Sequence, residues 1–452
     1  MVKRKYGTRL SWKFWEGLYF PISTKYTVSL LFATLWAVGS IYLARAWAND
    51  LNDLLGFDLG WIIIFGIAII PGFMNGFAAM SLILDIRPSR KKHFTKYPDV
   101  TILVAAYNEE AAIASTIASI ARQRYPGNMR TIVCNDGSQD GTSKIVRNLM
   151  KRYEWLGILD IYPNAGKANA LNQGLSATTS NLVITVDGDT YLYKDALINI
   201  VERYMSDPPN THAVAGAILV RNHDASICTK MQTFDYYIGI AGVKKLQSLY
   251  QGTLVAQGAF SLYDVETVRS VGGWPHTVGE DIVLTWGILR KGFRIGYAED
   301  AIVFTNAPET WGQFIHQRIR WSRGLVEAFK EHWPMLFQLR LTTLFIWWNL
   351  LFPYLDLVYT FAFVPGIILA FFGIYWIAGP MTLALVPIAL LMNWLSYKKQ
   401  SIIVEGMGIK VRENKLYFLW YALFYSIILQ PACVFGYIKE AVAGGVKNWG
   451  TK

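Results

Sequence analysis

The chain has 452 residues, enough for two or three domains, and 53% of them are hydrophobic, which excludes an ordinary soluble protein and indicates a membrane protein. The net charge is +11, but the basic residues cluster beside long apolar runs, so anionic lipids and an anionic substrate explain the charge more simply than nucleic acid does. Three widely spaced cysteines indicate neither a disulfide framework nor a zinc site.

The first 97 residues are expected to form an N-terminal membrane region. Through residue 26, lysines and arginines alternate with aromatic residues, which suits a short helix in the lipid headgroup layer. Apolar runs at residues 27–47 and about 59–84 are each long enough to cross a bilayer, although a signal peptide is the alternative for the first run. Acidic residues separate the two runs and a basic cluster follows the second. The positive-inside rule therefore places the N-terminus and everything after Asp85 in the cytoplasm.

From residue 98 to residue 324 the apolar runs shorten and strand and helix patterns alternate, which is typical of a soluble α/β domain. Strands are predicted at residues 100–106, 130–134 and 182–186, and a helix at residues 110–123. Polar residues follow each strand at its carboxyl end. Ligands of open α/β sheets bind outside the carboxyl ends of the strands, so this repetition predicts a nucleotide-binding site.

Asp187 and Asp189 come directly after the third strand. Two carboxylates this close raise each other's pKa unless a cation neutralises them. Mg²⁺ or Mn²⁺ is typically held by one or two carboxylates together with substrate phosphates, so the pair predicts a divalent metal beside a phosphate group. The alternative is an Asp-Gly turn with solvated carboxylates.

Residues 325–452 are expected to return to the membrane. Apolar residues recur among charged ones over residues 325–341, which indicates an interfacial helix. Apolar runs at about residues 342–376, 382–395 and 416–437 predict three spans, with a basic cytoplasmic loop before the last. The first run is long for one helix, so a break at Pro365 and Gly366 would add a sixth span and bring the C-terminus inside.

Five short motifs occur in order along the chain: residues 107–109, 135–138, 187–189, 279–281 and 317–321. Their order and spacing resemble the processive, membrane-integrated family-2 glycosyltransferases, which include cellulose, chitin, hyaluronan and poly-N-acetylglucosamine synthases. The resemblance covers roughly residues 100–324. It implies a GT-A fold, a Rossmann-like α/β domain inserted in the cytoplasm between N- and C-terminal transmembrane helices, with interfacial amphipathic helices at the junctions.

The resemblance also implies a site for a UDP-sugar. The residues that would meet the uridine, the diphosphate and its Mg²⁺ or Mn²⁺ are Ala105, Tyr107, Glu109, Asp136, Lys167, Asp187 and, as metal ligand, Asp189. A carboxylate can accept from the uracil N–H, and an aromatic ring can stack on the base. Taken without the family, the residues at 136–137 form a turn equally well, and Lys167 is a solvated lysine.

Asp281 is the expected catalytic base, and its neighbour Glu280 belongs to the substrate site by the same resemblance. Inverting glycosyl transfer needs a carboxylate within reach of the acceptor hydroxyl, opposite the leaving diphosphate. Relatives usually carry Thr-Glu-Asp here, whereas this chain has Gly279 in place of the threonine. The alternative role for Asp281 is a solvated or helix-capping carboxylate.

The residues Gln317, Arg318, Arg320 and Trp321 form the signature that, in this family, contacts the diphosphate through arginine and walls the acceptor site through tryptophan. Positions 317, 320 and 321 share one face of a helix. Arginine suits phosphate because of its fork of donors. Gln257 is placed near the acceptor by resemblance only. The alternative is that the tryptophan is core and the arginines are interfacial.

The sequence therefore predicts a multi-pass protein of the plasma membrane, a processive inverting synthase that transfers N-acetylglucosamine from UDP-GlcNAc to a growing polymer and exports it. Within the family, residues 307–310 and 239–257 look most like the bacterial poly-β-1,6-N-acetylglucosamine synthases, with hyaluronan and chitin synthases next. Two further hypotheses are a non-processive enzyme acting on a lipid carrier and a nucleotide-binding regulator of a channel. The expected partners are the UDP-sugar donor, the polysaccharide acceptor, membrane lipids and a small accessory membrane subunit, without nucleic acid.

Overall fold

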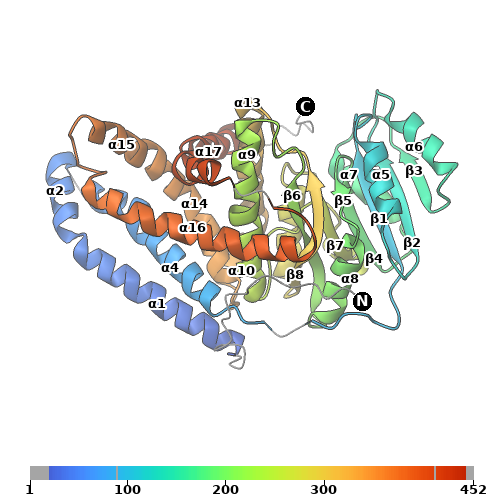
Figure 1. The fold of residues 1–452 in the computed structure, drawn as a ribbon, viewed down its shortest axis with the longest axis horizontal. Coiled ribbons are helices and arrows are strands. Elements are labelled where there is room, and N and C mark those ends of the chain that lie inside the picture. The colour runs from blue at the N-terminus through green and yellow to red at the C-terminus, as the bar shows by residue number, and fades with distance from the viewer. Residues whose placement is uncertain (1–19, 57, 88–89, 412–413, 444–452) are drawn as a thin grey trace.

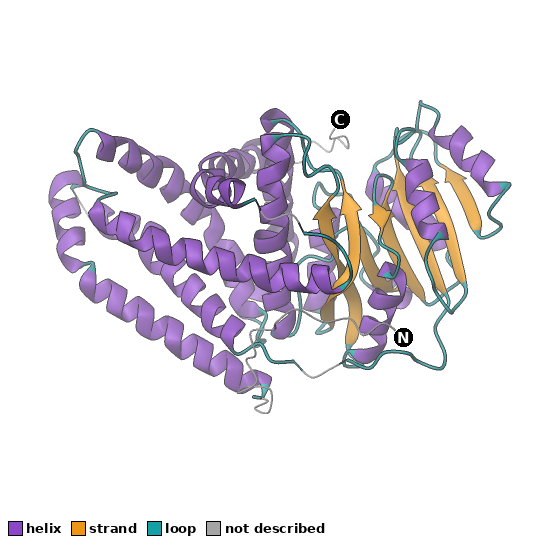
Figure 2. Ribbon diagram, viewed as in Figure 1, coloured by secondary structure: helices purple, strands orange, loops and turns teal. Residues whose placement is uncertain are grey.

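The structure is a computed structural model that describes residues 20–56, 58–87, 90–411 and 414–443 (Figure 1). An α/β part is built on one mixed sheet, and a bundle of long helices lies beside it (Figure 2). Most of the N-terminal interfacial helix expected from the sequence falls on residues 1–19, outside the described residues.

An eight-stranded sheet forms the centre of the α/β part, in the order β3-β2-β1-β4-β7-β6-β8-β5. The first four strands in this order are parallel, β7 is antiparallel to both of its neighbours, β6 and β8 are parallel, and β5 is antiparallel to β8. The strands span Val100–Ala106 (β1), Met129–Asn135 (β2), Leu156–Asp160 (β3), Leu182–Asp187 (β4), Tyr191–Leu192 (β5), Thr211–Val220 (β6), Phe260–Asp264 (β7) and Arg294–Thr305 (β8).

The three strands predicted from the sequence are β1, β2 and β4, and all seven residues of β1 are buried, as expected for a central strand. Successive side chains of a strand point to opposite faces of a sheet. Accordingly, Ile102 shares a core cluster with Ile117 of α5, whereas Leu103 shares another with Leu171 of α7. The helices around this half of the sheet are α5 (Ile113–Ala121), α6 (Thr142–Met150) and α7 (Lys167–Ser176), whereas α8 (Ala196–Ser206) packs on β6 and β8 in the other half.

The second half of the α/β part contributes further helices, of which α9, α10 and α13 pack against helices of the bundle. A single helical segment comprises α9 (Ile227–Asp235), a π-helical turn (Tyr236–Gly242) and α10 (Val243–Leu249). It is followed by α11 (Val265–Ser270), α12 (Glu280–Arg290) and α13 (Trp311–His332). A capping box between Thr310 and Gln313 begins α13. The interfacial helix expected at residues 325–341 is the second half of α13 followed by a 3₁₀ turn at Trp333–Phe337.

Four helical stretches among the described residues are long and apolar enough to cross a membrane: Ile22–Leu43, Leu59–Ile83, Thr343–Phe371 and Lys415–Val442. The third is one continuous helix that includes Pro365 in the first turn of its last segment, so the break that would have added a sixth span is not present. The span expected at residues 382–395 lies within α16, which is not among the four stretches. The helices of the bundle are α1 (Ile22–Leu43), α2 (Arg45–Leu55), α3 (Leu59–Ile64), α4 (Ile70–Ile83), α14 (Thr343–Val358), α15 (Val364–Phe371), α16 (Pro380–Gly406) and α17 (Lys415–Ala443).

Candidate active site at the sheet edge

The polar residues expected at the strand ends lie together at one edge of the sheet. In the parallel register, Ala105 of β1 is paired with Asp187 of β4 on one side and with Cys134 of β2 on the other. Tyr107 and Asp136 are the first residues after the ends of β1 and β2. The structure thus brings the ends of three separate strands to one place.

A tight turn at Gly188 holds the two flanking aspartates at this edge. The Gly188 N–H donates to the carbonyl oxygen of Ala105 over 2.9 Å, and its own carbonyl accepts from the Thr116 hydroxyl over 2.7 Å. A Cβ atom at position 188 would lie 2.8 Å from Cγ of Glu109. Only glycine therefore allows the turn to approach the β1 loop this closely.

The loop after β1 is fixed to the loop after β2. The N–H groups of Asn108 and Glu109 donate to the hydroxyls of Ser138 and Thr142, each over 2.9 Å. Asn108 adopts a φ of 54°, a left-handed conformation that asparagine tolerates better than most residues. Tyr107 and Glu109 on either side of it are half-buried at the site edge, where the sequence placed the uridine.

Asp136 is fully buried and binds backbone groups of the loop before α7. Its Oδ1 accepts from the N–H of Ala165 over 3.0 Å, and its Oδ2 accepts from the N–H of Gly166 over 2.8 Å. This carboxylate therefore positions the loop that precedes Lys167. The uridine contact expected of Asp136 stays a prediction.

Lys167, the first residue of α7, joins two acidic residues from different elements. Its ammonium lies 2.6 Å from Oδ1 of Asp187 and 3.3 Å from Oε1 of Glu280. Burial by itself lowers the pKa of Lys167, but Asp187, Glu280 and Asp281 outweigh it and raise the pKa well above its usual value. Lys167 is therefore a cation that two carboxylates stabilise. Burial raises the pKa of Glu280, and Asp281 adds to this while Lys167 opposes it.

Asp281 lies in the first turn of α12, where a carboxylate is stabilised by the helix N-terminus. Its Oδ1 accepts from the N–H of Ile282 over 2.8 Å, and its Oδ2 faces the N–H of Gly258 at 3.4 Å. Gln257, expected near the acceptor, is buried and donates to the carbonyl of Gly216 over 2.6 Å. The half-buried Asp281 and the buried Gln257 are therefore joined through the backbone at position 258.

Gly279, where the resemblance led us to expect threonine, contacts α13. A Cβ atom at position 279 would lie 2.5 Å from the Cα atom of Gly324. Glu327, also on α13, accepts from the N–H groups of Val278 and Gly279 over 3.1 and 2.9 Å. The missing threonine is thus explained by a close crossing of two backbones, and Glu327 fixes the start of α12.

The signature at residues 317–321 lies on α13, so the helical spacing assumed from the sequence is confirmed. Trp321 is 40% exposed, and Arg320 is close enough to Glu280 to lower its pKa. Gln317 is half-buried, and its Oε1 is without a hydrogen-bond partner among the described residues. Arg318 is buried and pairs with Asp235 instead of facing the carboxylate cluster.

Comparison with known proteins matches this domain to a family. A profile described as "Glycosyltransferase like family 2" covers residues 98–324, half of the chain. The chain belongs to glycosyltransferase family 2. Residues 98–324 therefore form a glycosyltransferase domain.

Curated relatives in the family share the domain. The chain is 34% identical over 226 residues to a protein of Staphylococcus aureus (strain COL) named poly-beta-1,6-N-acetyl-D-glucosamine synthase, covering 50% of this chain and 54% of the relative. A Staphylococcus epidermidis protein of the same name is 32% identical over 248 residues, covering 54% and 59%. The chain thus spans little more than half the length of the curated relatives it matches.

A solved structure shares the fold. The mannosyltransferase PcManGT from Pyrobaculum calidifontis, in complex with GDP-Man and Mn²⁺, superimposes with a TM-score of 0.58 at 21% identity, covering 85% of this chain and 99% of that one. This similarity confirms the GT-A fold expected from the sequence, flanked on both sides by apolar helices long enough to span a membrane.

The donor atoms available for a metal at this family-2 site are few. No group of three or more His, Cys, Asp or Glu side chains is arranged to hold a metal ion in the part of the chain that the structure describes. Asp187 is one-third exposed and shares its Oδ1 with Lys167, and Asp189 accepts from the hydroxyl of Thr305 over 3.4 Å. The two carboxylates fit a hard divalent cation that takes its remaining ligands from substrate phosphates and water.

A buried lysine that the motifs do not include lies near the expected base. Lys244 on α10 is 7% exposed and has no hydrogen bond or ion pair with any described residue. Burial lowers its pKa to about 7, although Asp281 acts in the opposite direction. A signal was available, because Lys244 lies in the largely apolar stretch at residues 236–249, where a charge needs a reason.

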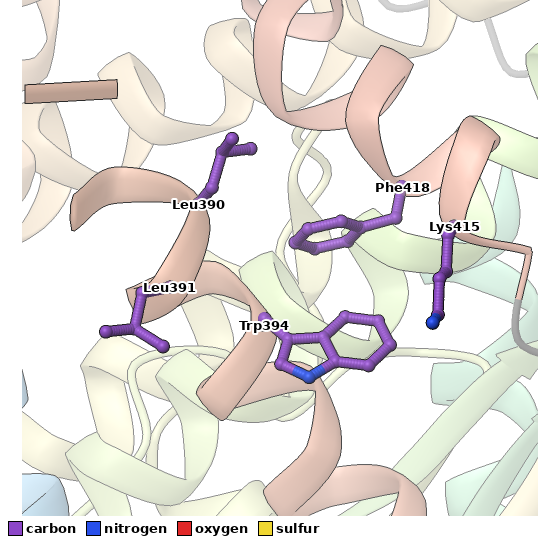
Figure 3. Close-up of a pocket in the computed structure, with 5 residues that line it drawn as sticks. All are labelled: Leu390, Leu391, Trp394, Lys415 and Phe418. Atoms are coloured by element: carbon purple, nitrogen blue, oxygen red, sulfur yellow. The ribbon is translucent and has the colours of Figure 1, made fainter. Parts of the chain in front are cut away.

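Two surface cavities lie away from Asp281. One, of about 370 Å³, lies between α16 and α17 and is shown in Figure 3. Its lining is apolar apart from a lysine at its edge: Leu390, Leu391, Trp394, Phe418 and Lys415. Another, of about 420 Å³, lies by the ends of β6 and β8 and is lined by Tyr191, Val220, Arg221, His223 and Phe304. Neither includes a residue that the family signature assigns to the site.

Proposed function

We propose that this enzyme is a processive inverting polysaccharide synthase that transfers N-acetylglucosamine from UDP-GlcNAc to a growing poly-β-1,6-N-acetylglucosamine chain and moves the product across the membrane. The observation that carries the proposal is the cluster of Lys167, Asp187, Glu280 and Asp281, which lies beside the crossing of α12 and α13. The names of the staphylococcal relatives support the donor and the polymer.

The cluster provides separate groups for the two ends of the reaction. Asp281 takes the proton from the acceptor hydroxyl while the hydroxyl oxygen attacks the anomeric carbon of the donor sugar. The bond from that carbon to the UDP oxygen breaks on the opposite face. The configuration at the anomeric carbon is therefore inverted. Lys167 and Arg320 would stabilise the charge on the leaving diphosphate. Tyr107 and Glu109 would contact the uridine, and Trp321 would form a wall of the acceptor site.

A divalent cation, Mg²⁺ or Mn²⁺, would be held by Asp189 with Asp187 and would neutralise charge on the departing UDP. Lys167 also pairs with Asp187, at 2.6 Å. We therefore expect chelation by EDTA to abolish transfer and added Mg²⁺ or Mn²⁺ to restore it.

The proposed organisation has three parts. Residues 1–97 and 325–452 would supply the membrane helices and the polymer path, and residues 98–324 the catalytic domain on the cytoplasmic side. The basic residues that follow the second apolar stretch support this orientation. Arg90 and Lys92 of this segment pair with Asp300 at 3.3 and 3.0 Å, so the linker from the membrane is held against the catalytic domain.

The test is sugar incorporation by the purified, detergent-solubilised protein with Mg²⁺ or Mn²⁺. Radiolabelled UDP-GlcNAc, UDP-Glc, and UDP-GlcNAc with UDP-GlcA are supplied in parallel, and products are sized on a gel. We expect long polymer from UDP-GlcNAc alone, with linkage assigned by enzymatic digestion. A requirement for UDP-GlcA would move the assignment to hyaluronan synthesis. Short, organic-extractable products in every lane would contradict polymer synthesis and favour a lipid-carrier acceptor.

A further inference from the structure

Arg318 belongs to a buried cluster that joins three helices. Its Nη2 donates to Oδ2 of Asp235 at the end of α9 over 2.8 Å and to the hydroxyl of Tyr425 on α17 over 3.0 Å. The Tyr425 hydroxyl donates to the same Asp235 oxygen over 2.9 Å, which closes a triangle. Figure 1 shows α9, α13 and α17 packed beside one another at this place.

The burial of this charged cluster is not explained by stability alone. Arg318, Asp235 and Tyr425 are only 5%, 6% and 2% exposed, and a buried ion pair is often no more stable than apolar residues of the same size. The chain also makes room for it, because a Cβ atom at Gly239 would lie 2.5 Å from Oδ1 of Asp235. Such a pair is better explained by the geometry that it imposes than by stability.

The buried cluster fixes the position of the Trp321 ring. The guanidinium of Arg318 lies 4.1 Å from the centre of the Trp321 ring and 4.8 Å from that of Phe314. These three residues are spaced at i, i+4 and i+7 along α13, so they share one face. Trp321 is the only one of the three that is exposed, at 40%. The cluster thus holds a planar cation against one face of the tryptophan and leaves the rest of the ring open.

We propose that Arg318 is a positioning residue for Trp321, held by Asp235 and Tyr425, and that it sets the orientation in which the indole meets the acceptor sugar. The proposal rests on the proposed function, in which Trp321 forms a wall of the acceptor site. In this proposal Arg318 acts through Trp321 and does not contact the donor diphosphate directly. Because Tyr425 lies on a membrane helix, the orientation of the acceptor wall depends on how α17 packs.

Two variants loosen the stack without emptying the site. Tyr425→Phe removes one hydroxyl and keeps the aromatic ring, whose centre lies 5.2 Å from that of the Phe314 ring. Arg318→Lys keeps the charge but loses the planar fork that makes both hydrogen bonds and the stack. Lys330→Met is the matched control, because Lys330 pairs with Glu440 at 2.8 Å and so also joins α13 to α17, away from Trp321.

Kinetics separate positioning from donor binding. We expect both variants to raise the KM for an N-acetylglucosamine oligosaccharide acceptor about tenfold, because each weakens a desolvated cation–π contact. The KM for UDP-GlcNAc should not change in either variant. Both KM values should be unchanged in the control. In a Trp321→Ala background, Arg318→Lys should have no further effect. A raised donor KM, or the same effect in both backgrounds, would overturn the proposal.

Footprinting tests the stack independently of sugar transfer. Oxidation of Trp321 by hydroxyl radicals is measured by mass spectrometry and normalised to Trp333, which is 59% exposed. We expect oxidation of Trp321 to increase in Tyr425→Phe and Arg318→Lys and not in Lys330→Met. Unchanged oxidation would contradict the proposal. If the wild-type protein transferred no sugar, the proposed function would fail, while footprinting would still decide whether Arg318 positions Trp321.

Discussion

The ammonium of Lys167 lies 2.6 Å from Oδ1 of Asp187, and this contact joins the start of α7 to the end of β4. The same ammonium is 3.3 Å from Glu280, the first residue of α12. One cation thus connects Asp187 with the helix that carries the expected base. Without the family resemblance, the sequence could not distinguish this lysine from a solvated one.

We predict that Lys167→Met lowers kcat/KM at least about 100-fold, because it removes a fixed positive charge from the leaving diphosphate. It also leaves Glu280 without its nearest cation, so the melting temperature should fall as well. Lys144→Met, at an exposed position on α6, is the control and should change neither quantity. Normal turnover in Lys167→Met would show that this lysine has only a structural role.

The crossing of Gly279 and Gly324 predicts that side chains are not tolerated at either position. Gly279→Ala places a Cβ atom 2.5 Å from backbone, where no side chain can move aside, and should cost about 1–3 kcal/mol of stability. The loss of activity should exceed what the loss of stability alone explains, because a shift in the start of α12 also displaces Asp281. Gly312→Ala is the control, since a Cβ atom there has nothing within 4 Å. Equal melting temperatures and activities for both variants would contradict the close crossing.

Lys244 predicts a pH dependence of stability. Burial lowers its pKa from the ordinary 10.5 to about 7, so the unfolded chain binds more protons than the folded one between these values. The free energy of unfolding therefore rises with pH between pH 7 and 10.5, by at most about 1.4 kcal/mol per pH unit for this one group. The contribution of Lys244 to stability is lowest below pH 7. Lys244→Met should be more stable than wild type at pH 7 and should flatten the slope of melting temperature between pH 7 and 9. An unchanged slope would show that Lys244 stays charged in the folded protein.

The parts of the fold and site that could be predicted from sequence are those set by local pattern. β4 reads as a strand because its residues are apolar and β-branched, and that places Asp187 and Asp189 at its end. The spacing of Gln317 and Trp321 had meaning because α13 is a regular helix. In each case the information lies within a few consecutive residues, where strand alternation and helical period operate.

The rest depends on contacts between distant positions. Gly279 could not be explained from its neighbours, because the reason is the backbone of Gly324. Arg318 seemed a phosphate ligand until the structure placed Asp235 and Tyr425 around it, from helices that one sequence does not pair. β3 was missed because Gly157 interrupts a short apolar run at the sheet edge.

The sharpest prediction concerns Asp281. Replacement by asparagine keeps the shape and the hydrogen bond from the N–H of Ile282 but removes the group that accepts the acceptor proton. We expect Asp281→Asn to lose sugar transfer, while UDP binding, measured by calorimetry in detergent, keeps an affinity within about threefold of wild type because the nucleotide contacts are elsewhere. Glu154→Gln, an exposed change at the other end of the domain, is the control. Retained transfer in Asp281→Asn would remove Asp281 from the mechanism, and lost UDP binding would place it in the donor site instead.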